Sequence, residues 1–229
     1  MIKSHTIDTA SRSIHIIFLH GLGDQGKSWK AAFQKISSEL KASTRHEVKF
    51  HLPDAAKIPV TLNGRTVMNA WYDIYGLGPN YKEDVQGMIR SCESITNIIN
   101  NIQLKEPDVR HQDIFLGGFS QGGAMSLFYS LVNTNKPLGG VFSHSSYLPG
   151  YKDHIVPLNV EKNRETPLMM IHGESDLVVG YQWGVLSHQI AKQYFKNNVL
   201  HPIKEMGHTV TPKTLHLIQD FIEKNIKNA

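Results

Sequence analysis

The hydrophobic residues of this chain form short continuous runs, separated by longer segments with a helical period. A short apolar run between turn residues is typical of a strand that is buried on both faces of a sheet. The runs that predict strands are residues 14–19, 48–52, 114–116, 141–142 and 168–171, and residues 200–204 are also strand-like.

Several segments between these runs place apolar residues on one face of a helix. The three clearest faces consist of Trp29, Ala32, Phe33, Ile36 and Leu40; of Val85, Met88, Ile89, Cys92, Ile95, Ile99 and Ile102; and of Leu215, Ile218, Phe221 and Ile222. The expected helix starts are Ser28 as the first cap, Asn80 with Glu83 as a capping box, and Thr211 before Pro212.

Strands that alternate with helices predict an α/β fold, in which helices cover both faces of a mostly parallel central sheet. The chain has 229 residues and 40% hydrophobic content, which suits one buried core, so residues 1–229 are expected to form a single domain. Residues 53–79 lack a clear period. Because long loops in compact domains are often functional, this segment is a candidate for the binding site.

Charge and cysteine content narrow the class of protein. The chain has 24 Lys and Arg against 20 Asp and Glu, and the basic residues are scattered, which argues against a nucleic-acid partner. Cys92 is the single cysteine, so an intramolecular disulfide is excluded, and its place on an apolar face makes it core filler. The sequence has no glycosylation sequon, apolar leader, membrane-spanning stretch or lipidation motif, and we therefore expect a cytoplasmic protein.

A candidate nucleophile lies where an apolar run meets a predicted helix. Residues 114–123 read IFLGGFSQGG and contain Gly-x-Ser-x-Gly around Ser120, with a helix expected from near Ala124. In the α/β-hydrolase fold this motif is a sharp strand-to-helix turn that exposes the serine, and Gly118 and Gly122 leave room for the turn. A phosphate-binding turn is the alternative, but its lysine is missing.

An oxyanion hole needs backbone donors near the serine. The helix start after Ser120 supplies the N–H of Gln121, and residues 20–24, with the sequence HGLGD, follow the first predicted strand. The second donor is therefore expected at the N–H of Leu22. A plain turn before a helix is the alternative interpretation of this glycine-containing loop.

The general base must be chosen among 13 histidines. In this fold the order along the chain is nucleophile, acid, histidine, which excludes His5, His15, His20, His46, His51 and His111. His208 lies on a Gly-containing turn between a strand and the last helix, and it is the candidate base. His201 and His216 are expected to be structural or solvated, and His172 is expected to support the site from behind.

The acid should follow the strand at 168–171, where residues 172–176 read HGESD. Asp176 is the candidate because it can hold the ring of His208 in the productive tautomer. Glu174 is the second carboxylate of this turn, and a helix-capping role for Asp176 is the structural alternative. The sequence has no His/Cys/Asp cluster with metal-ligand spacing, and no cofactor is expected.

Together these motifs resemble the acyl-protein thioesterase family of lysophospholipase-like carboxylesterases. The similar segments span nearly the whole chain and read LHGLGD at 19–24, PVT at 59–61, WYDI at 71–74, GGFSQGG at 117–123, HGESD at 172–176 and GH at 207–208. The resemblance implies an α/β-hydrolase fold and hydrolysis of long-chain acyl thioesters on S-acylated proteins, with activity on lysophospholipids and small esters. It also implies an acyl groove bordered by Trp71, Ile74, Tyr75, Leu77, Leu177 and Val178.

Three positions depart from the pattern that this resemblance implies. Ala56 and Gly180 replace common prolines, and His144 replaces an apolar residue. These changes bear on acyl-chain selectivity and leave the three candidate catalytic positions unaltered. Transient contact with a membrane surface is consistent with acylated substrates, whereas the oligomeric state is not readable from the sequence.

Two other functions stay open. One is a lysophospholipase or small-ester carboxylesterase without a protein substrate, because the motifs determine the acyl chemistry and say little about the leaving group. The other is a non-catalytic binding protein on a hydrolase scaffold, in which the catalytic residues would be expected to have decayed. All three catalytic positions are filled, which counts against the second function.

Overall fold

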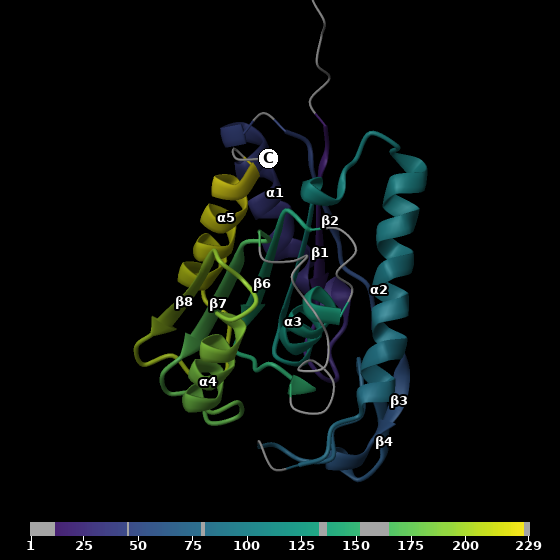
Figure 1. The fold of residues 1–229 in the computed structure, drawn as a ribbon, viewed down its shortest axis with the longest axis vertical. Coiled ribbons are helices and arrows are strands. Elements are labelled where there is room, and N and C mark those ends of the chain that lie inside the picture. The colour runs from purple at the N-terminus through teal and green to yellow at the C-terminus, as the bar shows by residue number, and fades with distance from the viewer. Residues whose placement is uncertain (1–11, 45, 79–80, 133–136, 152–164, 227–229) are drawn as a thin grey trace, which may run out of the picture.

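A six-stranded parallel sheet forms the centre of the protein (Figure 1). This computed structural model describes residues 12–44, 46–78, 81–132, 137–151 and 165–226. The strands lie in the order β2-β1-β5-β6-β7-β8, and every neighbouring pair is parallel. Their bounds are β1 (Ile14–Leu19), β2 (Val48–His51), β5 (Ile114–Phe119), β6 (Gly140–His144), β7 (Leu168–Gly173) and β8 (Asn198–Ile203).

Helices cover both faces of this sheet, as the sequence pattern predicted. The helices are α1 (Lys30–Thr44), α2 (Val85–Lys105), α3 (Gln121–Val132), α4 (Tyr181–Ala191) and α5 (Pro212–Ile226), with short 3-10 helices η1 (Gly26–Trp29) and η3 (His111–Asp113). Side chains alternate across β1: Ile16 and Phe18 pack in one core with α1 and α5, and Ile17 and Leu19 pack in the other. Helices α2, α3 and α4 contribute to that second core.

The predicted strands and helix faces agree closely with the structure. Strand β1 has the predicted bounds, the other strands differ by a few residues, and Cys92 lies in the core, 5% exposed. Helix α5 begins at Pro212, where the Thr211 hydroxyl accepts the N–H of Thr214 at 3.3 Å.

Two predicted helix starts were wrong. The cap of α2 is Asp84, which accepts the N–H of Gly87 at 2.9 Å; Asn80, the expected cap, lies outside the described residues. Ser28 lies inside η1, and α1 follows directly from that turn. For α2 the spacing of Asn80 and Glu83 matched a capping box, but Asp84 lies nearer the helix and can also cap it, and the sequence pattern did not separate the two.

Residues 53–79 contain a small antiparallel hairpin that the sequence analysis missed. Strands β3 (Lys57–Val60) and β4 (Thr66–Asn69) pair around the 3-10 turn η2 (Thr61–Asn63). Gly64 and Arg65 both have a φ of 62°, the left-handed conformation that the tight turn requires. The strands are too short to show a convincing period, which is why the segment was expected to be irregular.

None of the helices in the described ranges has the length and apolar character needed to cross a bilayer.

Candidate active site

Ser120 occupies the turn between β5 and α3 in a strained conformation. Its φ is 53°, in the left-handed region that non-glycine residues rarely adopt. The N–H of Ser120 donates to the carbonyl of His144 at 2.9 Å, and the Ser146 hydroxyl donates to the Ser120 carbonyl at 2.7 Å. These two bonds from the neighbouring strand end hold the serine in a conformation that its own preferences disfavour.

The glycines on either side of Ser120 are required by close backbone contacts. A Cβ on Gly118 would lie 2.4 Å from the Gly122 carbonyl carbon, and a Cβ on Gly122 would lie 2.1 Å from the Leu19 carbonyl oxygen. Any side chain at either position would push β1, β5 and α3 apart. The spacing of the motif therefore reflects how tightly this turn packs against the end of β1.

His208 links the serine to a carboxylate. It lies on the turn between β8 and α5, with Nε2 2.9 Å from the Ser120 Oγ and Nδ1 2.8 Å from the Asp176 Oδ2. The Phe119 ring packs against the imidazole, with the ring centroids 4.9 Å apart. Ser120, His208 and Asp176 thus come together from the carboxyl ends of three parallel strands, where ligands bind in such sheets.

Asp176 is buried and has both carboxylate oxygens occupied. It is 4% exposed, and its Oδ1 accepts the N–H groups of Val178 and Val179, each at 2.9 Å, while Oδ2 faces His208. The two backbone donors hold the carboxylate in a position that water cannot reach. Glu174, the alternative acid, is exposed to solvent on the same turn.

Two other buried histidines, His172 and His144, lie close to the hydrogen-bonded residues Asp176, His208 and Ser120. His172 has Nε2 2.7 Å from the Val179 carbonyl and 3.5 Å from the Asp176 Oδ2. Burial lowers the pKa of His172, and it lowers the pKa of His144 to about 3. Both rings are therefore neutral at physiological pH, and the Nε2–H of His172 donates to Val179, the residue whose own N–H binds Asp176.

The remaining candidate bases lie elsewhere. His201 is a partly exposed residue of β8, and His216 lies on the exposed face of α5. Among the described residues there is no group of three or more His, Cys, Asp or Glu side chains that could hold a metal ion.

The expected oxyanion donors lie on either side of Ser120. Gly21 approaches so closely that a Cβ there would lie 3.4 Å from the Ser120 Cβ, which brings the peptide of Leu22 to the nucleophile. Gln121 is the first residue of α3, so its N–H has no partner within the helix. Within the described part of the chain, neither backbone N–H donates a hydrogen bond.

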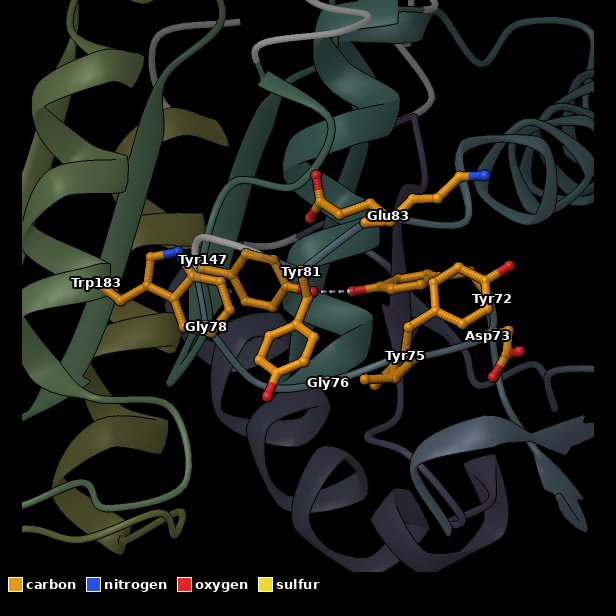
Figure 2. A pocket seen from close by; sticks show the side chains of 11 residues that line it. Tyr72, Asp73, Tyr75, Gly76, Gly78, Tyr81, Glu83, Tyr147 and Trp183 are labelled. Carbon is orange, nitrogen blue, oxygen red and sulfur yellow. Dashed lines mark hydrogen bonds between the residues drawn. The ribbon is translucent and has the colours of Figure 1, made fainter. Parts of the chain in front are cut away.

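The candidate acyl-binding residues separate into three groups. Leu77 and Val178 line one open groove of about 430 Å³. The other residues that line it are Gly78, Gly180, Gln182, Trp183 and Leu186. Ile74 and Tyr75 line a narrow neighbouring pocket (Figure 2). Trp71 is buried and Leu177 is 96% exposed, and neither lines these pockets.

A hydrogen-bonded pair of tyrosines lines the narrow pocket. The hydroxyl groups of Tyr72 and Tyr147 lie 3.0 Å apart. Figure 2 shows them facing each other, with Trp183 beside Tyr147. The Trp183 and Tyr147 rings stack with centroids 4.0 Å apart. Trp183 and Gly78 border this pocket, the groove and a further cavity of about 130 Å³, so the three spaces are neighbours.

The chain is similar to known hydrolases over almost its full length. The family model described as Phospholipase/Carboxylesterase matches residues 8–226. Acyl-protein thioesterase 1 homolog 1 of Dictyostelium discoideum is 35% identical over 219 residues, covering 96% of this chain and 93% of that protein. Acyl-protein thioesterase 1 of Gibberella zeae is 36% identical over 219 residues, covering 92% of this chain and 90% of that protein.

Two solved structures share the fold. Arabidopsis thaliana SOBER1 superposes with a TM-score of 0.83 at 26% identity, covering 94% of this chain and all of that chain (100%). Zea mays acyl-protein thioesterase 2 gives a TM-score of 0.79 at 25% identity, covering 95% of this chain and 96% of that chain.

Proposed function

Since this chain belongs to the phospholipase/carboxylesterase family and is a serine hydrolase of the α/β-hydrolase fold, we propose that it cleaves the acyl thioester of S-acylated proteins, with Ser120 as the nucleophile. His208 is the general base and Asp176 the acid that orients it. The observation that carries the proposal is the hydrogen-bonded series from Asp176 through His208 to Ser120, with contacts of 2.8 and 2.9 Å.

These three residues account for both halves of the reaction. The Ser120 Oγ attacks the acyl carbonyl carbon while the Nε2 of His208 takes the hydroxyl proton. The tetrahedral intermediate then collapses and its C–S bond breaks. The cysteine sulfur of the substrate takes the proton from His208 and leaves as a thiol, and an acyl-enzyme ester remains. Water then attacks this ester while His208 takes its proton. The second tetrahedral intermediate collapses, the bond between the acyl carbon and the Ser120 Oγ breaks, the Oγ regains the proton from His208, and the free fatty acid leaves.

The negative charge on the tetrahedral oxygen needs donors that are already in place. The backbone N–H groups of Leu22 and Gln121 are our candidates, because both are free of internal hydrogen bonds within the described residues and both flank Ser120. The turn at Ser120 supports this assignment, since it places the serine directly before the first N–H groups of α3.

A long acyl chain requires an apolar surface after it leaves the membrane. Each methylene that is buried is worth about 0.8 kcal/mol, so even part of a long chain contributes several kcal/mol to binding. The groove beside Leu77 and Val178 is the candidate surface, and its lining is largely apolar. We also propose that the protein acts in the cytoplasm and that it contacts a membrane surface transiently while the acyl chain is transferred.

Kinetics on three substrates test the proposal. A palmitoylated cysteine peptide, a lysophospholipid and a short ester would be compared by kcat/KM, with labelling by a fluorophosphonate as the check for an activated serine. We expect labelling and the highest kcat/KM on the thioester. A higher value on lysophospholipid or the short ester would favour an esterase without a protein substrate, and the absence of both labelling and turnover would favour a non-catalytic protein.

A further inference from the structure

Trp71 is buried between the two loops that carry the candidate oxyanion donors. It is 4% exposed, and it lies in the segment 69–72, which begins with the last residue of β4. This segment faces the loop at 20–24 on one side and the start of α3 on the other. Its hydrogen bonds to both define a role that neither the motif at 71–74 nor the pockets indicate.

Three hydrogen bonds connect segment 69–72 to the loop at 20–24. The indole Nε1–H of Trp71 donates to the His20 carbonyl at 2.9 Å. The Gly23 N–H donates to the Asn69 carbonyl, and the Asn69 side-chain amide donates to the Asp24 carbonyl, both at 2.8 Å. Residues on both sides of Leu22 are therefore held from the same segment.

The side chain of Gln121 connects the same segment to the nucleophile turn. Its Oε1 accepts the N–H of Trp71 at 3.0 Å, and its Nε2 donates to the Tyr72 carbonyl at 2.7 Å. A backbone N–H can only donate and a carbonyl can only accept, so the orientation of the Gln121 amide follows from its partners. The residue is 3% exposed, and both of these bonds are shielded from water.

The ring of His20 determines which way the Leu22 N–H points. His20 Nε2 accepts the N–H of Ala55 at 3.0 Å, so its proton is on Nδ1, which donates to the Gly21 carbonyl at 2.7 Å. That carbonyl and the Leu22 N–H belong to one trans peptide, in which the two groups point in opposite directions. Because His20 holds the carbonyl on its own side, the Leu22 N–H faces away from it.

We propose that Trp71, His20 and the side chain of Gln121 are positioning residues that fix the distance between the two oxyanion donors. The inference rests on the proposed function, because it assigns a purpose to these contacts only if Leu22 and Gln121 stabilise an oxyanion. Donors must lie within about 2.7–3.1 Å of the developing charge, and a displacement of about 1 Å can cost roughly 100-fold in rate. Two donors on separate loops need a common support, and segment 69–72 supplies it.

Trp71→Phe and Gln121→Met test this role. Trp71→Phe keeps an aromatic ring for the contact with His20 and removes the indole N–H together with part of the ring volume. Gln121→Met removes both side-chain hydrogen bonds at similar volume. Tyr129→Phe is the matched control: it removes a buried hydroxyl that lies 3.2 Å from Thr96, between α2 and α3 and away from both loops. Each variant would be measured for its melting temperature, for kcat and KM on a short thioester, and for inhibition by a trifluoromethyl ketone that forms a tetrahedral adduct with the serine.

We expect kcat to fall about 10-fold in Trp71→Phe and more in Gln121→Met, with KM changed less than about twofold. Misplaced donors stabilise the transition state less well and leave substrate binding in the ground state unaffected. The affinity for the trifluoromethyl ketone should fall by the same factor as kcat/KM. Tyr129→Phe should lower the melting temperature while both kinetic values stay near wild type.

The inference is wrong if Trp71→Phe and Gln121→Met behave like Tyr129→Phe, losing thermal stability but keeping kcat and inhibitor affinity. It is also wrong if KM rises while kcat is unchanged, because Trp71 would then act in substrate binding. The proposed function fails separately: in that case the wild type itself would neither hydrolyse the thioester nor bind the ketone.

Discussion

His208 and Asp176 lie 32 positions apart on different loops, yet the Nδ1 of His208 is 2.8 Å from the Asp176 Oδ2. The opposite oxygen of the carboxylate is held by two backbone N–H groups, so the aspartate cannot turn away from the ring. This geometry distinguishes Asp176 from Glu174, which is exposed on the same turn.

We therefore expect Asp176→Asn to reduce kcat by roughly three to four powers of ten, because it removes the charge that stabilises the imidazolium and favours the wrong tautomer. Glu174→Gln is the matched control and should stay within about twofold of wild type, since its side chain is solvated. Steady-state kinetics on a thioester would compare them. A larger loss in Glu174→Gln would mean that the acid has been assigned to the wrong carboxylate.

Ser120→Ala should leave a folded protein whose turnover is lower by roughly four to six powers of ten, because the covalent route is lost while substrate binding remains. Circular dichroism would check the fold, and fluorophosphonate labelling should disappear. Ser146→Ala is a useful comparison, because its hydroxyl binds the Ser120 carbonyl and takes no part in the chemistry. Substantial turnover by purified Ser120→Ala would rule out this nucleophile.

Leu22→Pro removes one oxyanion donor, and we expect a loss on the order of 3 kcal/mol in transition-state stabilisation from kcat/KM. Leu22→Ala keeps the N–H and should be mild. The contrast separates the backbone from the side chain of this residue. If the two variants lose activity equally, Leu22 acts by packing against the core instead.

Leu77→Asp should harm long acyl chains selectively. It places a charge in the groove that Leu77 shares with Val178, which opposes burial of methylenes there. We expect kcat/KM for a palmitoyl thioester to fall by about 10-fold or more and that for an acetyl thioester to stay near wild type. Leu104→Asp, at an exposed position of α2, controls for the added charge. Equal losses for both chain lengths would exclude Leu77 from the acyl groove.

Matched oxygen esters in the same assay test the leaving group. A cysteine thiol has a pKa of about 8.5, so its thiolate leaves more readily than an alkoxide does. Expulsion of the cysteine therefore depends less on proton donation by His208. Long-chain thioesters are therefore expected to be better substrates than oxygen esters of equal length. A wild type that prefers the oxygen ester would favour the carboxylesterase alternative.

A pair of histidines on β1 and the edge strand β2 should make stability depend on pH. Burial, followed by the neighbouring His15, lowers the pKa of His51 to about 4, and the two rings approach to 2.9 Å between Nδ1 of His15 and Nε2 of His51. The pKa of an unfolded histidine is about 6.5, so the unfolded chain binds the extra proton first as the pH falls. The stability associated with neutral His51 is present above about pH 6.5 and is lost as the pH drops toward 4.

Urea unfolding at pH 7 and pH 5 would measure this effect. Between pH 7 and pH 5 we expect the free energy of unfolding of the wild type to fall by about 1 kcal/mol more than that of His51→Gln, allowing for partial solvent screening of the ring. Glu106 contributes little in this window, because hydrogen bonds from Ser13 and Lys49 lower its pKa to about 2. His216→Gln, on the exposed face of α5, should lose the same free energy of unfolding between pH 7 and pH 5 as the wild type. If His51→Gln also does so, His51 is not the source of the acid sensitivity.

The sequence alone determined the features that depend on neighbouring residues. The apolar run at 14–19 predicted a doubly buried strand because its continuous pattern has no polar face. The glycines around Ser120 predicted a sharp turn, because a backbone that packs this closely tolerates no side chain. Chain order excluded six histidines, and positions on turns after predicted strands favoured His208 and Asp176; the two side chains meet in the folded protein.

Only the tertiary structure decided which distant residues support the site. The side chain of Gln121 binds the backbone of Trp71, 50 positions earlier in the chain, and the indole of Trp71 binds the carbonyl of His20. Trp71, expected in the acyl groove, is therefore buried between two loops. Periodicity and spacing report which residues avoid water and where the backbone turns. They carry no information about which polar group meets another across the core, because that pairing depends on how whole elements pack.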